Sequence, residues 1–304
     1  MKKDQVSLTA MMAAYERGYH AKYDDPKIFN DFLAFELLLQ RERTAFAQQF
    51  TKIVENCFPA KKFSGQEDAL SFFMQNMSST SDMISRARYA EDNLEETVKK
   101  QGVQQYLILG AGLDTFAFRR PDMGNQLRVF EVDHPATQLS KRQRIAELGW
   151  DNPLNLNFVP IDFTKDNLET AIKRSFYDSN ALTFISWLGV TYYLPRDTVF
   201  ATLRTIADSV PKGSSIIFDY YDADTFVPEK VASRMQGWKQ YTKQAGEPII
   251  TGFEASNLAI DLASLGLRLR ENLSPSEIEE RYFQGRTDNY HATEHTHYAW
   301  VVVE

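Results

Sequence analysis

The chain has 304 residues, with 34 Lys and Arg against 41 Asp and Glu and one cysteine, Cys57. This length favours a catalytic domain with a sizeable appendage, and a lone cysteine excludes an internal disulfide. The acidic balance argues against a general nucleic-acid surface, and no run reaches the roughly eighteen apolar residues of a membrane-spanning helix. No apolar secretory segment follows Lys2 and Lys3, so we expect a cytoplasmic protein with no nucleic-acid or membrane partner.

The first hundred residues have a helical pattern without an alternating strand run. Residues 24–26, Asp-Asp-Pro, supply an N-cap carboxylate and a proline suited to a first helical turn. The apolar residues that follow recur at helical spacing and predict a helix packed on the core: Ile28, Phe29, Phe32, Leu33, Leu37 and Leu38. A further helix is predicted from Asp82 to Lys100, ended by Gly102. We expect residues 1–103 to form an N-terminal helical cap.

From Gln104 onward, short apolar strands alternate with helices. The predicted strands are Gln105 to Leu109, Arg128 to Val132, Asn157 to Ile161, Thr183 to Trp187, Ser215 to Tyr220, Leu267 to Asn272 and His297 to Val303. The predicted helices are Pro135 to Leu148, Asp166 to Arg174, Arg196 to Ser209 and Glu254 to Ser264. This alternation is typical of an α/β domain with a doubly wound, mostly parallel sheet, here over residues 104–304. We expect the polar, aromatic stretch at about 222–253, which has no strand pattern, to close a pocket together with the N-terminal helices.

Two of these strands end in residues suited to a nucleotide cofactor. The first runs into Gly110, Ala111 and Gly112, and neither glycine has a Cβ that would keep a ligand from the backbone. The second ends in Asp133, whose carboxylate can accept hydrogen bonds from both hydroxyls of a ribose. A tight turn in any α/β domain could use such glycines, but the combination favours an adenosine-bearing cofactor.

The residues after the glycines discriminate between cofactors. A dinucleotide fingerprint has a third glycine where this chain has Thr115. The carboxylate of Asp114 also disfavours a phosphate on this turn, because like charges in a partly desolvated turn repel. S-adenosylmethionine has a ribose for Asp133, no phosphate, and sulfonium and ammonium groups that carboxylates favour. We therefore expect S-adenosylmethionine as the cofactor, and an NAD-dependent oxidoreductase is the disfavoured alternative.

Three segments together resemble the leucine carboxyl methyltransferase family: Leu109 to Thr115, Phe130 to Pro135 and Tyr193 to Pro195. The resemblance is strongest to the bacterial branch of S-adenosylmethionine-dependent O-methyltransferases of polyketide biosynthesis, and it extends from about Ser7 to Tyr220. It implies the fold of class I methyltransferases, a Rossmann-like sheet of seven strands. It also implies that the last strand of the chain is inserted antiparallel near the edge of the sheet.

The resemblance implies further cofactor contacts beyond the glycine turn. Asp162 and Phe163 would contact the exocyclic amine and the face of the adenine ring, with a local Asx turn at Asp162 as the alternative. His134 is expected to flank the cofactor. An arginine before the first strand would hold the carboxylate of the methionine part. Arg88 matches the family pattern best, and Arg86 is the alternative.

One position departs from the family pattern. Where the family has the glutamate of Glu-Gly-x-x-x-Tyr-Leu, this chain has Leu188. The resemblance places that glutamate near the methionine part of the cofactor, so its loss removes an expected contact to the amino group. Backbone carbonyls around Gly110 and Trp187 are candidates to replace it.

The need for a catalytic base depends on the methyl acceptor. The protein assists methyl transfer by alignment and desolvation; a carboxylate acceptor needs no base, whereas an alcohol or phenol usually does. Candidates for a catalytic role are His20, Tyr192 and Tyr221. Together with Tyr15 and Tyr19 they could line an aromatic pocket, and packing or surface positions are the alternative for each.

The segment from His291 to His297 contains three histidines and Glu294, residue types that bind transition metals. Its continuation into the alternating last strand would put His295 and His297 on one side and His291 beyond the turn. We therefore expect no metal site in this segment.

The sequence thus predicts an S-adenosylmethionine-dependent O-methyltransferase. Its acceptor would be a carboxylate or hydroxyl oxygen of a small molecule, and we expect that molecule to be an aromatic or polyketide-like metabolite. A protein C-terminal carboxyl methyltransferase and a cofactor-binding module without turnover are the alternatives. The altered motif at Leu188 does not support the first and is the only hint of the second. No motif indicates an oligomeric state.

Overall fold

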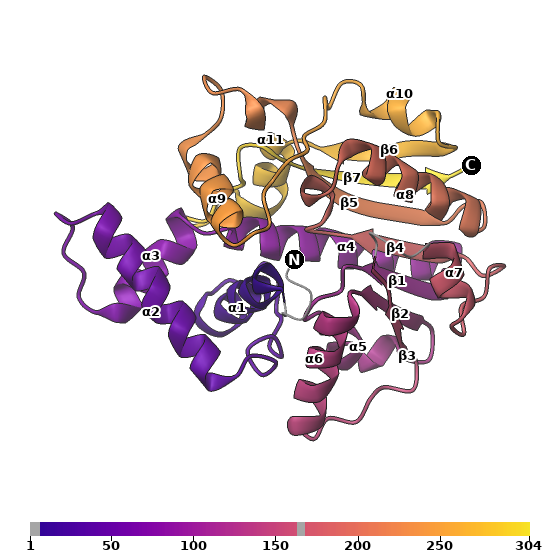
Figure 1. The fold of residues 1–304 in the computed structure, drawn as a ribbon, viewed down its shortest axis with the longest axis horizontal. Coiled ribbons are helices and arrows are strands. Elements are labelled where there is room, and N and C mark those ends of the chain that lie inside the picture. The colour runs from indigo at the N-terminus through magenta and orange to yellow at the C-terminus, as the bar shows by residue number, and fades with distance from the viewer. Residues whose placement is uncertain (1–6, 163–167) are drawn as a thin grey trace.

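The computed structural model describes residues 7–162 and 168–304, and within them seven strands form one mixed sheet (Figure 1). The strands are β1 (Gln105–Leu109), β2 (Arg128–Asp133), β3 (Leu156–Pro160), β4 (Thr183–Trp187), β5 (Ser215–Tyr221), β6 (Leu267–Leu273) and β7 (Thr296–Val303). Their order is β3-β2-β1-β4-β5-β7-β6, and β7 pairs antiparallel with both β5 and β6. This order confirms the predicted α/β fold, with its last strand inserted antiparallel.

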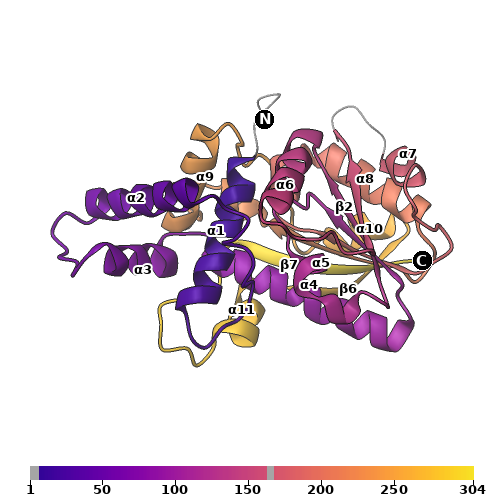
Figure 2. The ribbon, with the colours of Figure 1, turned by 90° about the horizontal axis from the view of Figure 1, so that it is seen from below.

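Helices cover both faces of the sheet and form a further layer beside it. The N-terminal helices are α1 (Leu8–Tyr23), α2 (Gln40–Cys57), α3 (Gln66–Asn76) and α4 (Thr80–Gln101). The others are α5 (Phe116–Arg119), α6 (Pro135–Glu147), α7 (Leu168–Lys173), α8 (Arg196–Ser209), α9 (Ser233–Gln244), α10 (Leu258–Ala263) and α11 (Pro275–Ile278). Short turns of other helix types are η1 (Pro121–Met123), η2 (Thr191–Tyr193), η3 (Ala223–Phe226) and η4 (Glu279–Phe283). In Figure 2, α2 and α3 project away from the sheet, and α1 lies between that pair and the sheet.

The strand boundaries agree with the sequence predictions to within one residue. Each strand is a short apolar run bounded by turn residues, and both signals are local. The helix predicted from Glu254 to Ser264 is shorter in the structure and spans only α10. Before α10 the backbone carbonyl of Glu254 accepts the N–H of Asn257 (3.0 Å) in a turn. The helix predicted from Asp166 begins outside the described residues.

The helix predicted after the Asp-Asp-Pro run is wrong, and residues 24–39 follow a path of turns from α1 to α2. Its apolar residues still reach the core, among them Phe29, Leu37 and Leu38. The backbone N–H of Ile28 donates to Nε2 of His20 (2.9 Å), and Asp31 accepts from the hydroxyl of Thr115 (2.6 Å). These contacts with residues outside the segment outweigh a weak local helix preference.

Two hydrophobic cores lie on the two faces of the sheet. Successive strand residues point to opposite faces, so Tyr106 and Ile108 of β1 join one core and Leu107 and Leu109 join the other. Side chains of α4, α5 and α6 pack into the first core, and those of α7, α8 and α10 into the second. The first core also contains side chains of α1, α2 and α3, so these helices and the sheet share a continuous core. A domain boundary near residue 103 stays a prediction.

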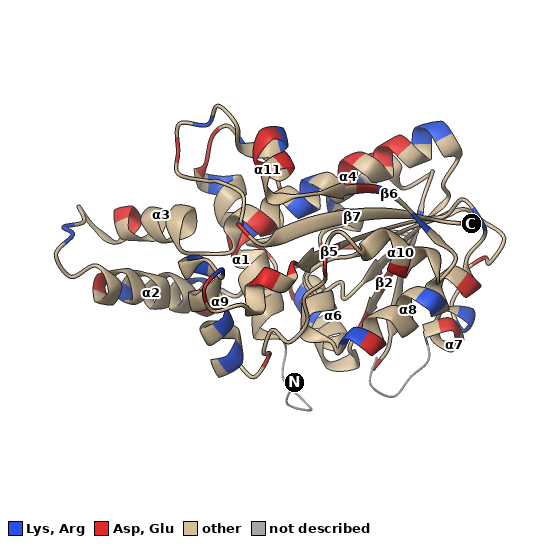
Figure 3. Ribbon diagram, turned by 90° about the horizontal axis from the view of Figure 1, so that it is seen from above, with Lys and Arg blue, Asp and Glu red and all other residues tan. Residues whose placement is uncertain are grey.

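Acidic and basic residues are interspersed along the outer helices (Figure 3). Several form exposed ion pairs four residues apart: Arg88 with Asp92, Lys99 with Glu95, and Lys173 with Glu169. Such exposed pairs contribute only about 0.3–0.5 kcal/mol each. Throughout the two described ranges, no helix combines the length and the apolar character needed to cross a membrane.

Glu16 of α1 is a fully buried carboxylate with incomplete hydrogen bonding. Its Oε2 accepts from the hydroxyl of Ser79 (2.8 Å), whereas its Oε1 has no hydrogen-bond partner within the described residues. Burial raises the pKa of Glu16 to about 7 from an ordinary value of 4.5, and the Ser79 hydrogen bond opposes the rise.

We expect Glu16→Gln to raise the free energy of unfolding by about 3 kcal/mol at pH 8 and by about 1 kcal/mol at pH 5. The folded state binds the Glu16 proton more tightly than the unfolded state does. The natural chain therefore loses stability as the pH rises from about 4.5 to about 7, and glutamine escapes this loss while still accepting from Ser79. Urea unfolding at both pH values measures the difference. The exposed Glu229→Gln is the control; a difference for Glu16→Gln that does not grow with pH contradicts the prediction.

Candidate functional site

The glycine turn follows β1 and is held against β2. The backbone N–H groups of Gly110 and Ala111 both donate to the carbonyl of Val132 (2.8 and 3.2 Å). Gly110 and Gly112 have φ angles of +69° and +54°. Residues other than glycine rarely adopt this backbone conformation. A Cβ on Gly110 would also lie 2.6 Å from Cγ2 of Val190. The path of the turn therefore requires glycine.

Asp133 at the end of β2 closes the other side of the turn. Its Oδ2 accepts a short hydrogen bond from the backbone N–H of Gly112, and its Oδ1 accepts from the backbone N–H of His134 (2.5 Å). Burial raises the pKa of Asp133 above its ordinary value, and these two N–H groups oppose the rise. The structure thus brings together the turn and the carboxylate that the sequence singled out.

Asp114 and Thr115 fix the residues after the turn. Asp114 accepts the backbone N–H of Phe116 (2.7 Å) at the start of α5, which has four residues. The hydroxyl of Thr115 donates to Asp31 (2.6 Å). A carboxylate therefore occupies the N-terminal end of a helix of one turn. A dinucleotide-binding protein has a longer helix here, and its N-terminal end binds the pyrophosphate.

A cavity of about 530 Å³ opens beside the carboxyl ends of β1, β2, β3 and β4, the edge at which doubly wound sheets bind ligands. Its lining residues on the sheet side include Gly110, Ala111, Gly112, Leu113, Asp114, Asp133, His134, Ile161, Asp162, Ser186, Leu188 and Gly189. Those from the surrounding helices and loops include Ser7, Thr9, Ala10, Met12, Ala13, Arg17, Met83, Arg86, Tyr192, Tyr193, Trp238 and Glu247.

The charged groups of the cavity are mostly carboxylates. The lining acidic residues in the described part are Asp31, Glu91, Asp114, Asp133, Asp162 and Glu247, and the basic ones are Arg17, Arg86 and Arg119. Arg17 is paired with Asp31 (2.9 Å), and Arg119 forms a short ion pair with Glu91. With six acidic and three basic residues, the cavity suits a ligand that carries positive charge.

Of the two α4 arginines considered from the sequence, Arg86 lines the cavity and Arg88 does not, so the preference for Arg88 is corrected. The residues that α4 contributes have the spacing of one helix face: Met83, Arg86, Ala87, Ala90 and Glu91. Arg88 lies off this face, with its side chain 50% exposed and paired with Asp92 (2.7 Å). Residues two positions apart on a helix point in different directions, so only one of these arginines can reach the site.

Arg86 is buried and held by neighbouring side chains. Its Nη1 donates to Oδ2 of Asp219 (2.8 Å) and to the phenol oxygen of Tyr192 (3.1 Å). Its Nη2 lies 2.9 Å from the sulfur of Met83. Burial alone would lower the pKa of Arg86, but the charge of Asp219 raises it well above its ordinary value. Arg86 is therefore a permanent cation in the wall of the cavity.

The other predicted cofactor residues follow β2, β3 and β4. His134 lines the cavity and is the N-cap of α6, where its Nδ1 accepts the backbone N–H of Ala136 (3.3 Å). Asp162 lines the cavity after β3, and Phe163 lies outside the described residues. The side chain of Trp187 is fully buried in the second core, because it points to the opposite face of β4. The role predicted for Trp187 concerned its backbone carbonyl, and it stays a prediction.

His20 is a buried structural residue, which corrects its prediction as a candidate base. Its Nε2 accepts the backbone N–H of Ile28 (2.9 Å), so this nitrogen carries no proton, and its Nδ1 then donates to Asp24 (2.8 Å). Tyr290 donates to the same carboxylate oxygen (2.9 Å). Both ring nitrogens are engaged by the protein, and neither is free to take a proton from a substrate.

Among the predicted tyrosines, Tyr192 lines the cavity. Tyr221 is stacked on it, with ring centroids 4.3 Å apart, and is buried away from the cavity. Tyr15 and Tyr19 pack in the first core. Burial raises the pKa of Tyr192 and of Tyr221 above their ordinary values, so both phenols stay protonated at neutral pH. The structure therefore corrects the prediction of a role for Tyr221.

Some lining residues had no recognisable signal in the sequence. Glu247 accepts hydrogen bonds from the hydroxyls of Thr9 (2.6 Å) and Ser7 (3.3 Å), so the start of α1 is tied to the segment after α9. Trp238 of α9 lines the cavity and stacks on Tyr241, with ring centroids 5.7 Å apart. These contacts join distant parts of the chain, and no local pattern marks them.

The C-terminal histidines contact protein groups. Nδ1 of His295 lies 2.8 Å from Oδ1 of Asp222, and its Nε2 accepts the backbone N–H of Ala232 (3.0 Å). His297 lies 3.7 Å from the same aspartate, and the exposed His291 is hydrogen-bonded to the carbonyl of Asn289 (2.8 Å). In residues 7–162 and 168–304, no set of three or more His, Cys, Asp or Glu residues is arranged to hold a metal ion.

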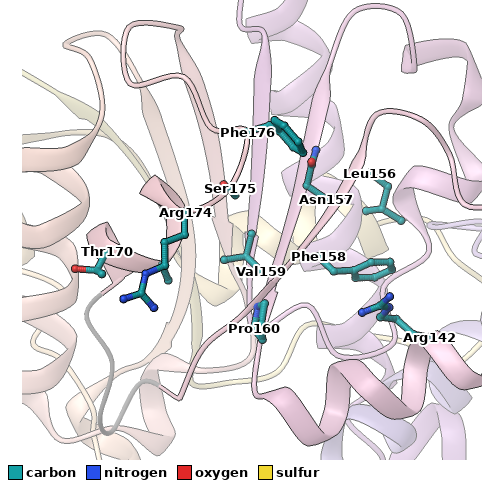
Figure 4. A pocket seen from close by; sticks show the side chains of 11 residues that line it. Arg142, Leu156, Asn157, Phe158, Val159, Pro160, Thr170, Arg174, Ser175 and Phe176 are labelled. Carbon is teal, nitrogen blue, oxygen red and sulfur yellow. The ribbon is translucent and has the colours of Figure 1, made fainter.

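A second groove, of about 660 Å³, lies along the outer edge strand β3 (Figure 4). Its two cations do not converge, since Arg142 and Arg174 lie on opposite sides of the strand in Figure 4. Pro160 at the end of β3 has no N–H to offer a further strand. This groove lacks the glycine turn and the carboxylates, so we assign the site to the cavity at the carboxyl ends of the strands.

The sheet order and the glycine turn facing Asp133 match the class I methyltransferase fold that the sequence resemblance implies. The sequence model of the leucine carboxyl methyltransferase family matches residues 10–207, and the chain belongs to that family. A relative from Bacillus subtilis (strain 168), the "Putative S-adenosyl-L-methionine-dependent methyltransferase YktD", is 35% identical over 305 residues, which cover 99% of each chain.

Two solved structures share the fold. A DUF574 family protein from Streptomyces avermitilis MA-4680 is 12% identical and superposes with a TM-score of 0.56, covering 84% of this chain and 97% of that chain. A protein from Thermobifida fusca YX, described as a putative methyltransferase, is 15% identical and has a TM-score of 0.56, covering 84% of this chain and 94% of that chain. At these identities the similarity shows the fold alone.

Proposed function

We propose that the protein is an S-adenosylmethionine-dependent O-methyltransferase whose acceptor is a carboxylate or hydroxyl oxygen of a small, aromatic or polyketide-like metabolite. The observation that carries the proposal is the cavity in which the glycine turn, Asp133 and Arg86 meet. Membership of a methyltransferase family, and the name of the relative YktD, support the same cofactor.

The residues of the cavity fit the parts of S-adenosylmethionine. The glycines allow the positive φ angles that hold the turn beside Asp133, and Asp133 would accept from the ribose hydroxyls. Asp162 and His134 would border the adenosine, and Arg86 would hold the carboxylate. The acidic lining favours the sulfonium and ammonium groups. With Leu188 in the wall, backbone carbonyls near Gly110 would contact the ammonium group.

The acceptor side of the cavity is apolar and aromatic. Its side chains come from the N-terminal helices, η2 and α9: Met12, Met83, Tyr192, Tyr193 and Trp238. Flat apolar walls of this kind suit an aromatic ring. Because about 530 Å³ must hold both the cofactor and the acceptor, the volume favours a small molecule over a protein terminus.

The chain contributes alignment and exclusion of water to the reaction. When bound, S-adenosylmethionine supplies a methyl group on a sulfonium for transfer to a nucleophilic oxygen. The helix α1 covers the turn closely, since the Cβ of Ala10 lies 3.1 Å from where a Cβ on Gly112 would be. The Glu247 contacts with Ser7 and Thr9 hold α1 against the loop after α9. These elements would shield the reacting atoms from solvent.

Transfer of a labelled methyl group from S-adenosylmethionine to a panel of hydroxylated and carboxylated aromatic acids tests the proposal. We expect a labelled product, whose base-labile bond would identify an ester and whose base-stable bond an ether. Cofactor binding without product from any acceptor would instead indicate a module without turnover. Label found only on a peptide C-terminus would indicate a protein carboxyl methyltransferase.

We expect Gly110→Ala to weaken S-adenosylmethionine binding by about tenfold or more. Alanine at a φ of +69° costs about 1–2 kcal/mol, and its Cβ would lie 2.6 Å from Val190, so the turn must move from its place beside Asp133. Isothermal titration calorimetry measures the affinity. The control is Gly237→Ala in α9, where a Cβ meets no atom within 4 Å. Equal affinities of Gly110→Ala and the natural chain would contradict the prediction.

A further inference from the structure

Asp219 of β5 lies behind the cavity and connects two groups that border it. Its side chain is 1% exposed and is not part of the described cavity lining. Its Oδ2 accepts from Nη1 of Arg86 (2.8 Å), and its Oδ1 accepts from the backbone N–H of Gly189 (2.7 Å). One buried carboxylate therefore fixes an arginine of α4 and the turn after β4 relative to each other.

The guanidinium of Arg86 packs tightly in this arrangement. A Cβ on Gly189, whose φ is +74°, would lie 2.5 Å from Nη2 of Arg86. Tyr192 accepts from Nη1 (3.1 Å), and within the described residues Nη2 makes a polar contact with the sulfur of Met83 alone (2.9 Å). Gly189 thus makes room for the guanidinium, and Asp219 is the one carboxylate in direct contact with it among the described residues.

We infer that Asp219 is a positioning residue for the carboxylate group of S-adenosylmethionine. The inference rests on the proposed function, in which Arg86 binds that group. Asp219 and Tyr192 engage Nη1, so Nη2 and Nε supply the N–H donors for a second carboxylate. Leu188 stands at the position of the family glutamate. Asp219 brings a negative charge close to this position, because it accepts from the next residue, Gly189. It acts through Arg86 without touching the cofactor.

Asp219→Asn tests this role in the full chain. The amide keeps an oxygen that accepts the N–H of Gly189. Its NH₂ group would face Nη1 of Arg86, and because both groups are donors, the guanidinium must turn. We expect the Kd for S-adenosylmethionine to rise about 10- to 100-fold. The Kd for 5′-methylthioadenosine, which lacks the amino-acid part, should change less than about twofold. Calorimetric titration measures both. Equal weakening of the two ligands, as a merely structural role requires, would overturn the inference.

Arg86→Met separates this inference from the proposed function. If it leaves S-adenosylmethionine binding unchanged, Arg86 does not hold the carboxylate, and both the proposed contact and the inference fail. If Arg86→Met weakens binding and Asp219→Asn does not, the inference alone fails.

Two further variants keep the test decisive. Asp24→Asn, at a buried, hydrogen-bonded carboxylate outside the described cavity lining, is the matched control and should leave both affinities unchanged. Gly189→Ala pushes Nη2 away while Asp219 is retained, and it should reproduce the selective loss of S-adenosylmethionine even if Asp219→Asn does not fold. Selective loss in neither variant would overturn the inference.

Discussion

Asp133→Ala is expected to weaken the binding of S-adenosylmethionine by about 100-fold or more. In the proposed complex this carboxylate accepts from both ribose hydroxyls, and a hydrogen bond to a charged group contributes about 1.5–3 kcal/mol. The alanine also removes the acceptor that orients the backbone N–H of Gly112. Isothermal titration calorimetry with the purified full chain measures the affinity.

Two further variants show which property of Asp133 matters. Asp133→Asn keeps one oxygen for the N–H of Gly112 but loses the charge and one acceptor, so we expect an intermediate loss of affinity. Asp208→Ala, at an exposed aspartate of α8, is the same substitution away from the cavity and should bind like the natural chain. If Asp133→Ala binds S-adenosylmethionine with unchanged affinity, the assignment of the cofactor site fails.

Lys141→Met is expected to lower the free energy of unfolding by about 3–5 kcal/mol. Lys141 of α6 and Glu131 of β2 form a short, buried ion pair, and each side chain is 1% exposed. Burial raises the pKa of Glu131 to about 7 even though Lys141 opposes the rise. Without the lysine, Glu131 would be left charged without a partner or would take up a proton, and either change disfavours folding at neutral pH.

The double variant Glu131→Leu with Lys141→Met should recover most of this loss, because it removes the second charge as well as the first. Urea unfolding of both variants measures the recovery. Lys173→Met is the matched control, since Lys173 pairs with Glu169 on the surface of α7 with 65% of its side chain exposed, and it should change stability by less than about 0.5 kcal/mol. A Lys141→Met variant as stable as the natural chain would refute the prediction.

The strands and the glycine turn were predictable because their signals are local. A buried strand of a parallel sheet is a short apolar run between turn residues, and a φ near +69° at Gly110 selects glycine whatever surrounds it. The parallel pairing of β1 with β2 then places Asp133 beside the turn without further information. Sequence reasoning therefore placed the turn and Asp133 together, as the structure does, and their role in cofactor binding stays a proposal.

The arginine of the site was harder to choose. Arg86 and Arg88 are both plausible from a motif, and their faces differ only in what packs against α4. A signal was present, because Met83, Ala87 and Ala90 share the face of Arg86 at helical spacing. The sequence also contained a signal that His20 is structural. Asp24 follows His20 by one helical turn, and its carboxylate holds the imidazole.

The sequence by itself determined the α/β class, the positions of the seven strands, and the glycine turn with its carboxylate. These features depend on residues within a few positions of one another, or on the pairing of neighbouring strands. Only the tertiary structure decided that residues 24–39 do not form a helix, that Arg86 faces the cavity, and that Asp219 holds it. The contact between Arg86 and Asp219 joins segments more than a hundred residues apart, and the packing of whole elements, rather than any local preference, brings them together.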